Sequence, residues 1–88
     1  MEKRYLQSNV SNFLSSDFGE ELLLMNLTTG NFFNLNEVCA DIWRKAYSGT
    51  SLDELLQYLV SEYDVPPEVC KQETIKCITE MTSKQILI

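Results

Sequence analysis

The side chains that could act as nucleophiles or metal ligands are three cysteines, Cys39, Cys70 and Cys77. No two of them form a CxxC pair, and the sequence has no histidine, the commonest metal ligand and general base in proteins. No basic residue lies at helical spacing from them, so no neighbouring cation would activate a thiol. We expect three reduced thiols that pack as small apolar side chains, and no metal site, cofactor or enzymatic activity.

Three carboxylates, Asp17, Glu20 and Glu21, are a second source of possible chemistry. General acid–base catalysis needs a carboxylate held against its substrate in a framed site. These acids lie in or beside the turn-like stretch 15–19, without a partner acid in a pocket. We therefore expect them to be surface residues.

Length and composition bound the classes of protein that this chain can belong to. With 88 residues, 44% of them hydrophobic, the chain is expected to form one domain over residues 1–88, with residues 1–12 as a loose N-terminal arm. The net charge of −6 argues against a nucleic-acid partner, because duplex binding depends on lysine and arginine.

The N-terminus lacks the apolar core of a signal peptide, and the longest apolar run, residues 22–25, is too short to cross a membrane. We expect a cytoplasmic protein without a membrane partner.

Two turn-bounded apolar segments predict a β-hairpin. Residues 22–27 form the clearest strand, residues 28–30 (Thr-Thr-Gly) suit a hairpin loop with glycine in the left-handed conformation, and residues 31–35 return antiparallel. On the returning strand Phe33 and Leu35 share one face. A further short strand is expected at residues 10–16. Together these segments predict a three-stranded antiparallel sheet.

After residue 35 the apolar residues recur at helical spacing. Asn36 is expected to cap a first helix that stops at Ser48-Gly49. The pattern Ser51-Leu52-Asp53-Glu54 is a capping box for a second helix, and Pro67 suits the first turn of a third. The expected fold class is therefore α+β, with three strands followed by a bundle of three helices.

The predicted central strand is apolar at consecutive positions, with Leu22 and Leu24 on one face and Leu23, Met25 and Leu27 on the other. Such a strand is typical of a sheet that is covered on both faces. Three short helices can cover one face. The other face is left for residues 1–12, for a second copy of the chain, or for a peptide that docks in an extended conformation.

The segment 31–35 could offer an open sheet edge. It contains no proline, lysine or charge, the residues that usually protect an edge from pairing with another chain. An unprotected edge is a template for an added strand, although the sequence of a strand covered by the chain's own helix would look the same.

The last helix carries Glu73, Lys76 and Glu80 on one flank. This flank is either an ordinary solvated face or the far wall of a groove.

Two runs of residues carry a resemblance to a known family. The run Gly30-Asn31-Phe32-Phe33-Asn34-Leu35-Asn36-Glu37, followed by Ile42-Trp43, resembles the PqqD-like family, as does Leu52-Asp53-Glu54-Leu55-Leu56 ahead of Glu62-Tyr63-Asp64-Val65. The resemblance extends from about residue 20 to residue 88 and agrees with the expected element order. Members are small peptide chaperones, also called RiPP precursor recognition elements, where RiPP denotes a ribosomally synthesised and post-translationally modified peptide.

The resemblance implies a winged helix-turn-helix-like fold and a non-catalytic function. It implies binding of the leader segment of a precursor peptide, which adds as a strand beside the third strand and packs against the third helix. The implied partner is a modifying or processing enzyme: a leader protease, a cyclase or a radical enzyme. Carried over by position, the leader-binding residues are Asn31, Phe32, Phe33, Asn34, Val69, Glu73, Lys76, Cys77 and Glu80.

The chain departs from the members that build pyrroloquinoline quinone at two positions. The last helix ends at Gln85 where glycine is usual, and Ser48-Gly49 replaces an Asp-Gly. The stretch Glu62-Tyr63-Asp64-Val65 is more similar to stand-alone members from lasso-peptide clusters.

Two other interpretations remain open from the sequence. One is an acidic structural or dimerisation subunit that uses the apolar sheet face, which would make the protein a homodimer. The other is a DNA-binding regulator, but residues 51–65 hold four acids and no lysine or arginine, opposite to what a DNA-reading helix needs.

Overall fold

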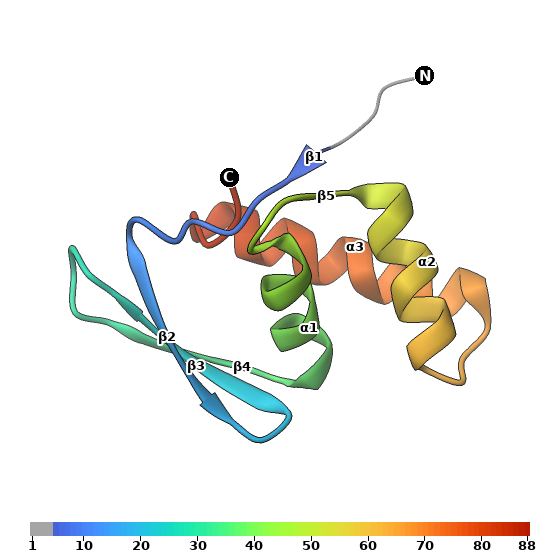
Figure 1. Cartoon of the computed structure of the whole chain (residues 1–88), viewed down its shortest axis with the longest axis horizontal. Helices are drawn as coiled ribbons and strands as arrows, with labels where there is room; N and C mark the ends of the chain where they lie inside the picture. The colour runs from blue at the N-terminus through green and yellow to red at the C-terminus, as the bar shows by residue number, and fades with distance from the viewer. Residues whose placement is uncertain (1–4) are drawn as a thin grey trace.

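The chain folds into a three-stranded antiparallel sheet on one side and three helices on the other (Figure 1). The structure is a computed structural model that describes residues 5–88. The elements are β1 (Tyr5–Leu6), β2 (Phe13–Phe18), β3 (Glu21–Asn26), β4 (Phe32–Leu35), α1 (Glu37–Ala46), β5 (Thr50–Ser51), α2 (Leu52–Glu62) and α3 (Pro67–Ser83). The predicted α+β class, with a three-stranded sheet followed by three helices, is confirmed.

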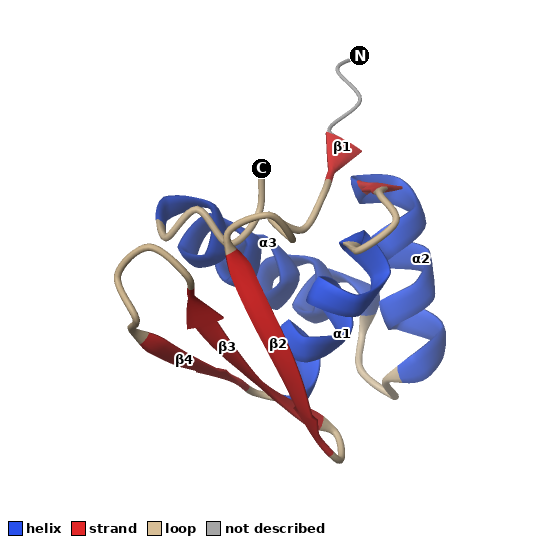
Figure 2. Ribbon diagram, turned by 60° about the vertical axis from the view of Figure 1, so that its left-hand side comes forward, coloured by secondary structure: helices blue, strands red, loops and turns tan. Residues whose placement is uncertain are grey.

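The sheet has the strand order β2-β3-β4, so β4 is an edge strand (Figure 2). Strands β3 and β4 pair with Leu24 opposite Phe33 and Leu22 opposite Leu35, and Gly30 adopts a φ of 77° in the loop between them. This is the predicted hairpin. Its faces also agree with the prediction, because Leu22, Leu24 and Leu35 are buried while Asn34 is exposed.

The first strand of the sheet lies later in the chain than expected. Residues 17 and 18, which lie beyond the predicted strand 10–16 in the predicted turn, continue β2 and pair with β3 as far as Phe18 opposite Glu21. Phe13 is buried against Trp43, with the ring centroids 6.4 Å apart, and this contact fixes where β2 begins. The turn moves to Gly19 and Glu20, where glycine supplies a φ of 63°.

The helices begin where the sequence predicts. The Asn36 side chain accepts a hydrogen bond of 3.0 Å from the Cys39 amide, and the Ser51 hydroxyl accepts one of 3.2 Å from the Glu54 amide. Pro67 occupies the first turn of α3. No helix in residues 5–88 is long and apolar enough to cross a membrane.

The N-terminal segment, expected as a loose arm, is held in place from residue 5 to residue 8. Strand β1 pairs with β5, and Ser8 forms a bridge with Leu87. The buried Ser8 hydroxyl also donates a hydrogen bond of 2.7 Å to the Trp43 carbonyl. The expectation for residues 1–4 falls outside the described part of the chain.

The core lies between the sheet and the helices, with α1 as the helix that contacts β3 and β4. Its completely buried large side chains come from β3 and all three helices, and from the C-terminal tail: Leu22, Leu24, Ile42, Trp43, Leu55, Leu59, Ile78 and Ile86. This core fixes the distance between β4 and α3.

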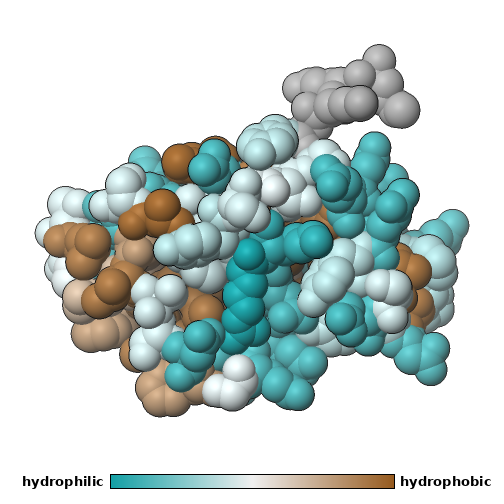
Figure 3. All heavy atoms as spheres, viewed as in Figure 1, coloured by the Kyte–Doolittle hydropathy of each residue, from teal (hydrophilic) through white to brown (hydrophobic). Residues whose placement is uncertain are grey.

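The outer face of the sheet is not covered by the described residues, contrary to the expectation of cover on both faces. Residues 5–9 pair with β5 and the C-terminal tail instead. A row of three apolar residues in register crosses the three strands on this outer face: Leu14, Met25 and Phe32. The side chains of Leu14 and Phe32 are exposed. Figure 3 shows apolar side chains gathered over the end of the molecule that holds the sheet.

The Asn36→Ala variant is expected to lose about 1 kcal/mol of stability, because the first turn of α1 then lacks its side-chain cap. For a domain of this size this corresponds to a fall in Tm of about 4–8 °C. Thermal unfolding followed by circular dichroism measures it. Asn36→Asp, which keeps a capping oxygen, is the control and should stay close to the parent protein; an unchanged Tm in Asn36→Ala would contradict the prediction.

Candidate functional site

The outer edge of β4 is not paired with another strand of the described chain. Antiparallel strands alternate between residues whose backbone groups face the partner strand and residues whose groups face away. The Asn26 amide donates to the Asn31 carbonyl at 2.8 Å, so the backbone groups of residues 31, 33 and 35 face β3. Phe32 and Asn34 therefore direct their N–H and C=O groups outward, away from the sheet.

The side chains of these two residues leave that edge open. Phe32 is 62% exposed on the outer face of the sheet. The Asn34 amide donates a hydrogen bond of 3.0 Å to a Glu21 carboxylate oxygen on β3, which holds its side chain over the sheet. An extended chain could approach the backbone of β4 without displacing either side chain.

A groove of about 360 Å³ adjoins the open edge. Strand β4 and the start of α1 form one wall, and the end of α3 and the C-terminal tail form the other. The Lys84 ammonium lies 5.4 Å from the centroid of the Phe33 ring and Glu80 lies one turn before it, so the α3 wall carries both charges. The lining residues are Phe32, Phe33, Asn34, Leu35, Asn36, Cys39, Glu80, Met81, Lys84 and Ile86.

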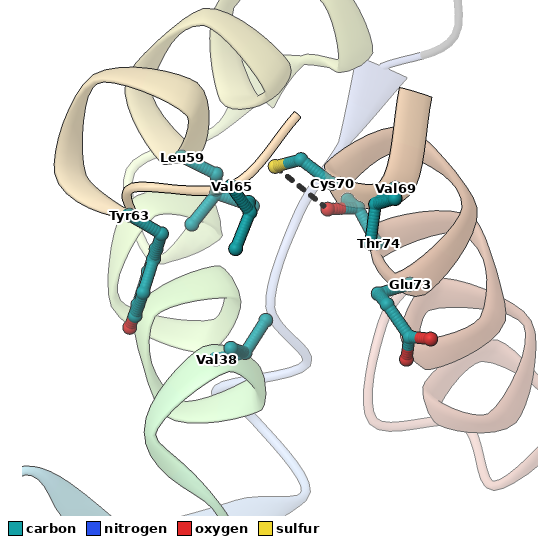
Figure 4. A pocket seen from close by; sticks show the side chains of 8 residues that line it. All are labelled: Val38, Leu59, Tyr63, Val65, Val69, Cys70, Glu73 and Thr74. Atoms are coloured by element: carbon teal, nitrogen blue, oxygen red, sulfur yellow. Dashed lines mark hydrogen bonds between the residues drawn. The ribbon is translucent and has the colours of Figure 1, made fainter. Parts of the chain in front are cut away.

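A second, smaller pocket of about 120 Å³ lies between the first half of α3, the end of α2 and the start of α1 (Figure 4). Its lining is almost entirely apolar. Figure 4 shows Val38, Leu59 and Val65 on one side and Val69 and Cys70 on the other, with Glu73 beside Val69 on α3. A cavity of this kind accepts one apolar side chain, since an engineered apolar cavity of about 150 Å³ binds benzene.

A partly buried hydrogen bond fixes one wall of this pocket. The Tyr63 hydroxyl donates to the Asp41 carboxylate on α1, which holds the tyrosine ring beside Val38 and Val65. Burial of the ring, and then this hydrogen bond, raise the pKa of the Tyr63 phenol well above its ordinary value. The phenol therefore stays protonated and keeps the wall in place across the whole physiological pH range.

Of the acids expected on the surface, Asp17 has a structural partner. The Arg44 guanidinium lies 3.0 Å from the Asp17 carboxylate and 3.4 Å from that of Asp41, and it also approaches the backbone carbonyls of the Gly19 turn. The ion pair with Asp17 raises the pKa of Arg44. These contacts attach the β2–β3 turn to α1, so Asp17 serves the fold rather than carboxylate chemistry.

Between the groove and the pocket, two thiols meet. The Cys39 and Cys77 sulfur atoms are 3.0 Å apart, with Cys39 in the first turn of α1 and Cys77 in the middle of α3. The Cys39 thiol donates a hydrogen bond that lowers the pKa of Cys77; the same hydrogen bond, followed by burial, raises the pKa of Cys39. Cys70 lies elsewhere on α3, buried beside Thr74. All three thiols are free.

The residues expected to form the site fall into three places. Phe32, Phe33, Asn34 and Glu80 line the groove, and Val69 and Glu73 line the smaller pocket. Cys77 contacts Cys39 between them, while Asn31 and Lys76 line neither space. The groove and the smaller pocket thus both border α3, from Val69 near its start to Lys84 at its end.

Sequence reasoning missed several lining residues. Lys84 lies four residues after Glu80 and could have been found by extending the charged flank of α3 by one turn. Val38 and Cys39 carry no such signal, because their position against α3 depends on how α1 packs. Leu35 was expected within the edge segment 31–35 and Asn36 as a helix cap, but neither was expected to bind the leader.

Comparisons with known proteins give two matches. The sequence profile of the family described as Coenzyme PQQ synthesis protein D (PqqD) matches residues 21–87. The solved structure of TbiB1 in complex with the TbiA(beta) leader peptide is similar to this chain, with a TM-score of 0.82 and 22% sequence identity over 92% of this chain and 93% of that one. No curated protein sequence matches. The structural likeness supports the fold described above.

Proposed function

Because this chain belongs to the PqqD family, we propose that it is a non-catalytic adaptor for a ribosomally made precursor peptide. It binds the leader segment of the precursor as an added strand along β4 and delivers the precursor to a modifying or processing enzyme. The similar structure contains TbiB1 with a leader peptide, which supports this assignment.

The observation that carries the proposal is the open edge of β4 beside a groove. Phe32 and Asn34 present outward N–H and C=O groups, and a guest strand would lie about 4.8 Å from them. Because side chains alternate along a strand, every second residue of the guest would enter the groove toward α3. Backbone hydrogen bonds would supply affinity that depends little on sequence, and the groove would select among leaders.

The smaller pocket supplies a second point of selection. Its apolar lining between Val38, Val69 and Tyr63 suits one aliphatic or aromatic side chain of the guest. Glu73 and Glu80 on the same side of α3, together with the net charge of −6, favour leaders with basic flanks.

We assign the partners and the pathway by the same reasoning. The stretch 62–65, which resembles stand-alone members from lasso-peptide clusters, favours a leader protease and a macrolactam-forming cyclase as the enzymes that receive the precursor. The chain itself would contribute no catalytic group and no cofactor, since it lacks histidine and the Asp17 carboxylate pairs with Arg44.

A titration with a fluorescein-labelled leader segment of the precursor encoded beside this chain's gene tests the proposal. Fluorescence anisotropy is expected to show saturable binding of the leader and none of the core segment. Because apolar burial and backbone hydrogen bonds dominate, raising the salt from about 50 to about 500 mM should weaken binding by less than about threefold. Equal binding of both segments, or a steep loss with salt, would contradict it.

The exposed outer face favours a second candidate, a homodimer. Leu14, Met25 and Phe32 form an apolar row across the sheet that a second copy could cover. Light scattering with and without the leader segment separates the two functions. A monomer that becomes a one-to-one complex supports the adaptor, and a stable dimer that ignores the leader supports the structural subunit.

A further inference from the structure

The contact between Cys39 and Cys77 is closer than ordinary packing of two thiols requires. Their sulfur atoms are 3.0 Å apart, and a disulfide bond is about 2.05 Å long, so about 1 Å of approach separates the pair from a covalent bond. Both residues are half-buried rather than sealed in the core. A small oxidant can therefore reach the pair.

The two thiols have different chemical roles in this arrangement. The Cys39 thiol donates its hydrogen to the Cys77 sulfur, which makes Cys77 the thiol that ionises first. Lys76 also favours the Cys77 thiolate, while Glu73 and Glu80 oppose it. The pair thus contains an attacking sulfur and an adjacent thiol that can resolve the first oxidation product.

We propose that Cys39 and Cys77 form a reversible disulfide when the protein meets a peroxide, and that this bond locks α1 to α3 and fixes the width of the β4–α3 groove. The regulatory part of this inference rests on the proposed function. The formation of the bond does not.

The oxidation balances with a peroxide as the only co-reactant. The Cys77 thiolate attacks one peroxide oxygen, the O–O bond breaks, and Cys77 becomes a sulfenic acid while hydroxide leaves and takes up a proton. The Cys39 sulfur then attacks the Cys77 sulfur and displaces the hydroxyl group, which leaves as water with the Cys39 proton. Two thiols are oxidised to one disulfide, and hydrogen peroxide is reduced to two molecules of water.

The position of the bond explains its effect on the groove. Cys39 lies on the groove wall, four residues after the last residue of β4, so its distance from α3 controls the distance between the open edge and the opposite wall. A covalent link keeps these walls from separating. A guest then loses less conformational freedom when it binds, and we expect it to dissociate more slowly from the oxidised protein.

The bond should also stabilise the fold. It connects residues 38 positions apart and therefore removes many conformations from the unfolded chain. The expected rise in Tm is about 10 °C or more for a domain of this size. Any thiol reductant should reverse it.

The experiment compares the parent protein with Cys39→Ser, Cys77→Ser and the matched control Cys70→Ser, each treated with hydrogen peroxide and then with dithiothreitol. Intact mass, free-thiol counts and Tm are recorded without peptide. The parent protein and Cys70→Ser should lose two hydrogens as monomers and gain Tm, and dithiothreitol should restore both. Cys39→Ser and Cys77→Ser should form no internal disulfide; circular dichroism confirms that each variant is folded.

Anisotropy with the labelled leader segment then separates the two proposals. We expect the oxidised parent protein to bind at least about threefold more tightly than the reduced protein, through slower dissociation. Oxidation without an internal disulfide in the folded parent protein overturns the inference, and a disulfide with unchanged or weaker affinity overturns the groove lock. Failure of the reduced protein to bind the leader overturns the proposed function and leaves the disulfide itself intact.

Discussion

Asn34→Pro is expected to weaken leader binding at least tenfold, which corresponds to about 1.4 kcal/mol or more. Proline removes the outward N–H of residue 34 and places its ring where the guest strand would lie. Because the backbone groups of residues 33 and 35 face β3, the pairing within the sheet should survive. Fluorescence anisotropy with the labelled leader segment measures the loss, and circular dichroism confirms that the sheet is retained.

Two control variants isolate the backbone of β4. Asn34→Ala removes the hydrogen bond to Glu21 but keeps the N–H, so its affinity should remain close to that of the parent protein. Ser15→Pro makes the same change on β2, the opposite edge of the sheet. The Leu27 amide donates to the Asn12 carbonyl, so the backbone groups of even-numbered residues of β2 face β3. Residue 15 therefore directs its N–H outward. Strand addition along β4 is ruled out if Asn34→Pro binds as tightly as Ser15→Pro.

Val69→Asp is expected to reduce leader affinity at least tenfold through the smaller pocket. An apolar guest side chain that is fully buried there would contribute about 1.5–3 kcal/mol, and a carboxylate at the pocket mouth would remove most of that gain. Glu73 lines the same pocket, so the new charge would also face a like charge. The same anisotropy titration measures the effect.

The matched control is Val10→Asp, because Val10 is 43% exposed and Val69 is 45% exposed. Both substitutions therefore disturb stability by a similar, small amount, but Val10 lines neither the groove nor the pocket. Equal leader affinity in the two variants would show that the pocket does not contact the guest. It would leave the test of the β4 edge unaffected.

The hairpin shows how much of the fold could be predicted from neighbouring residues. The Thr-Thr-Gly loop and the alternation of residues 31–35 predicted both the turn and which side chains share a face, because each depends on contacts within a few residues. The start of β2 was wrong by three residues. It depends on Phe13 packing against Trp43, which lies thirty positions away and leaves no local pattern.

The candidate site, like the fold, has parts that neighbouring residues indicate and parts that depend on contacts between distant elements. The sequence of β4 was compatible with an open edge or with a covered strand, and the charged flank of α3 with a solvated face or a groove wall. Neither pattern could say whether the two enclose a groove. The pocket beside Val38 and the contact between Cys39 and Cys77 arise only where α1 packs on α3. From the sequence, the cysteines were expected to pack as separate small apolar side chains, and Cys77 to bind the leader, with no contact expected between Cys39 and Cys77.

By itself, the sequence determined the order of the elements, the helix caps at Asn36 and Ser51, and the composition that disfavours catalysis and nucleic-acid binding. These follow from residue types and from interactions along a few neighbouring positions. Only the tertiary structure decided three features: the edge of β4 stays unpaired among the described residues, residues 5–8 pair with β5 and the C-terminal tail, and two thiols 38 positions apart meet. Each of these depends on how separate elements pack against one another, and hydrophobic periodicity marks a buried face without identifying what buries it.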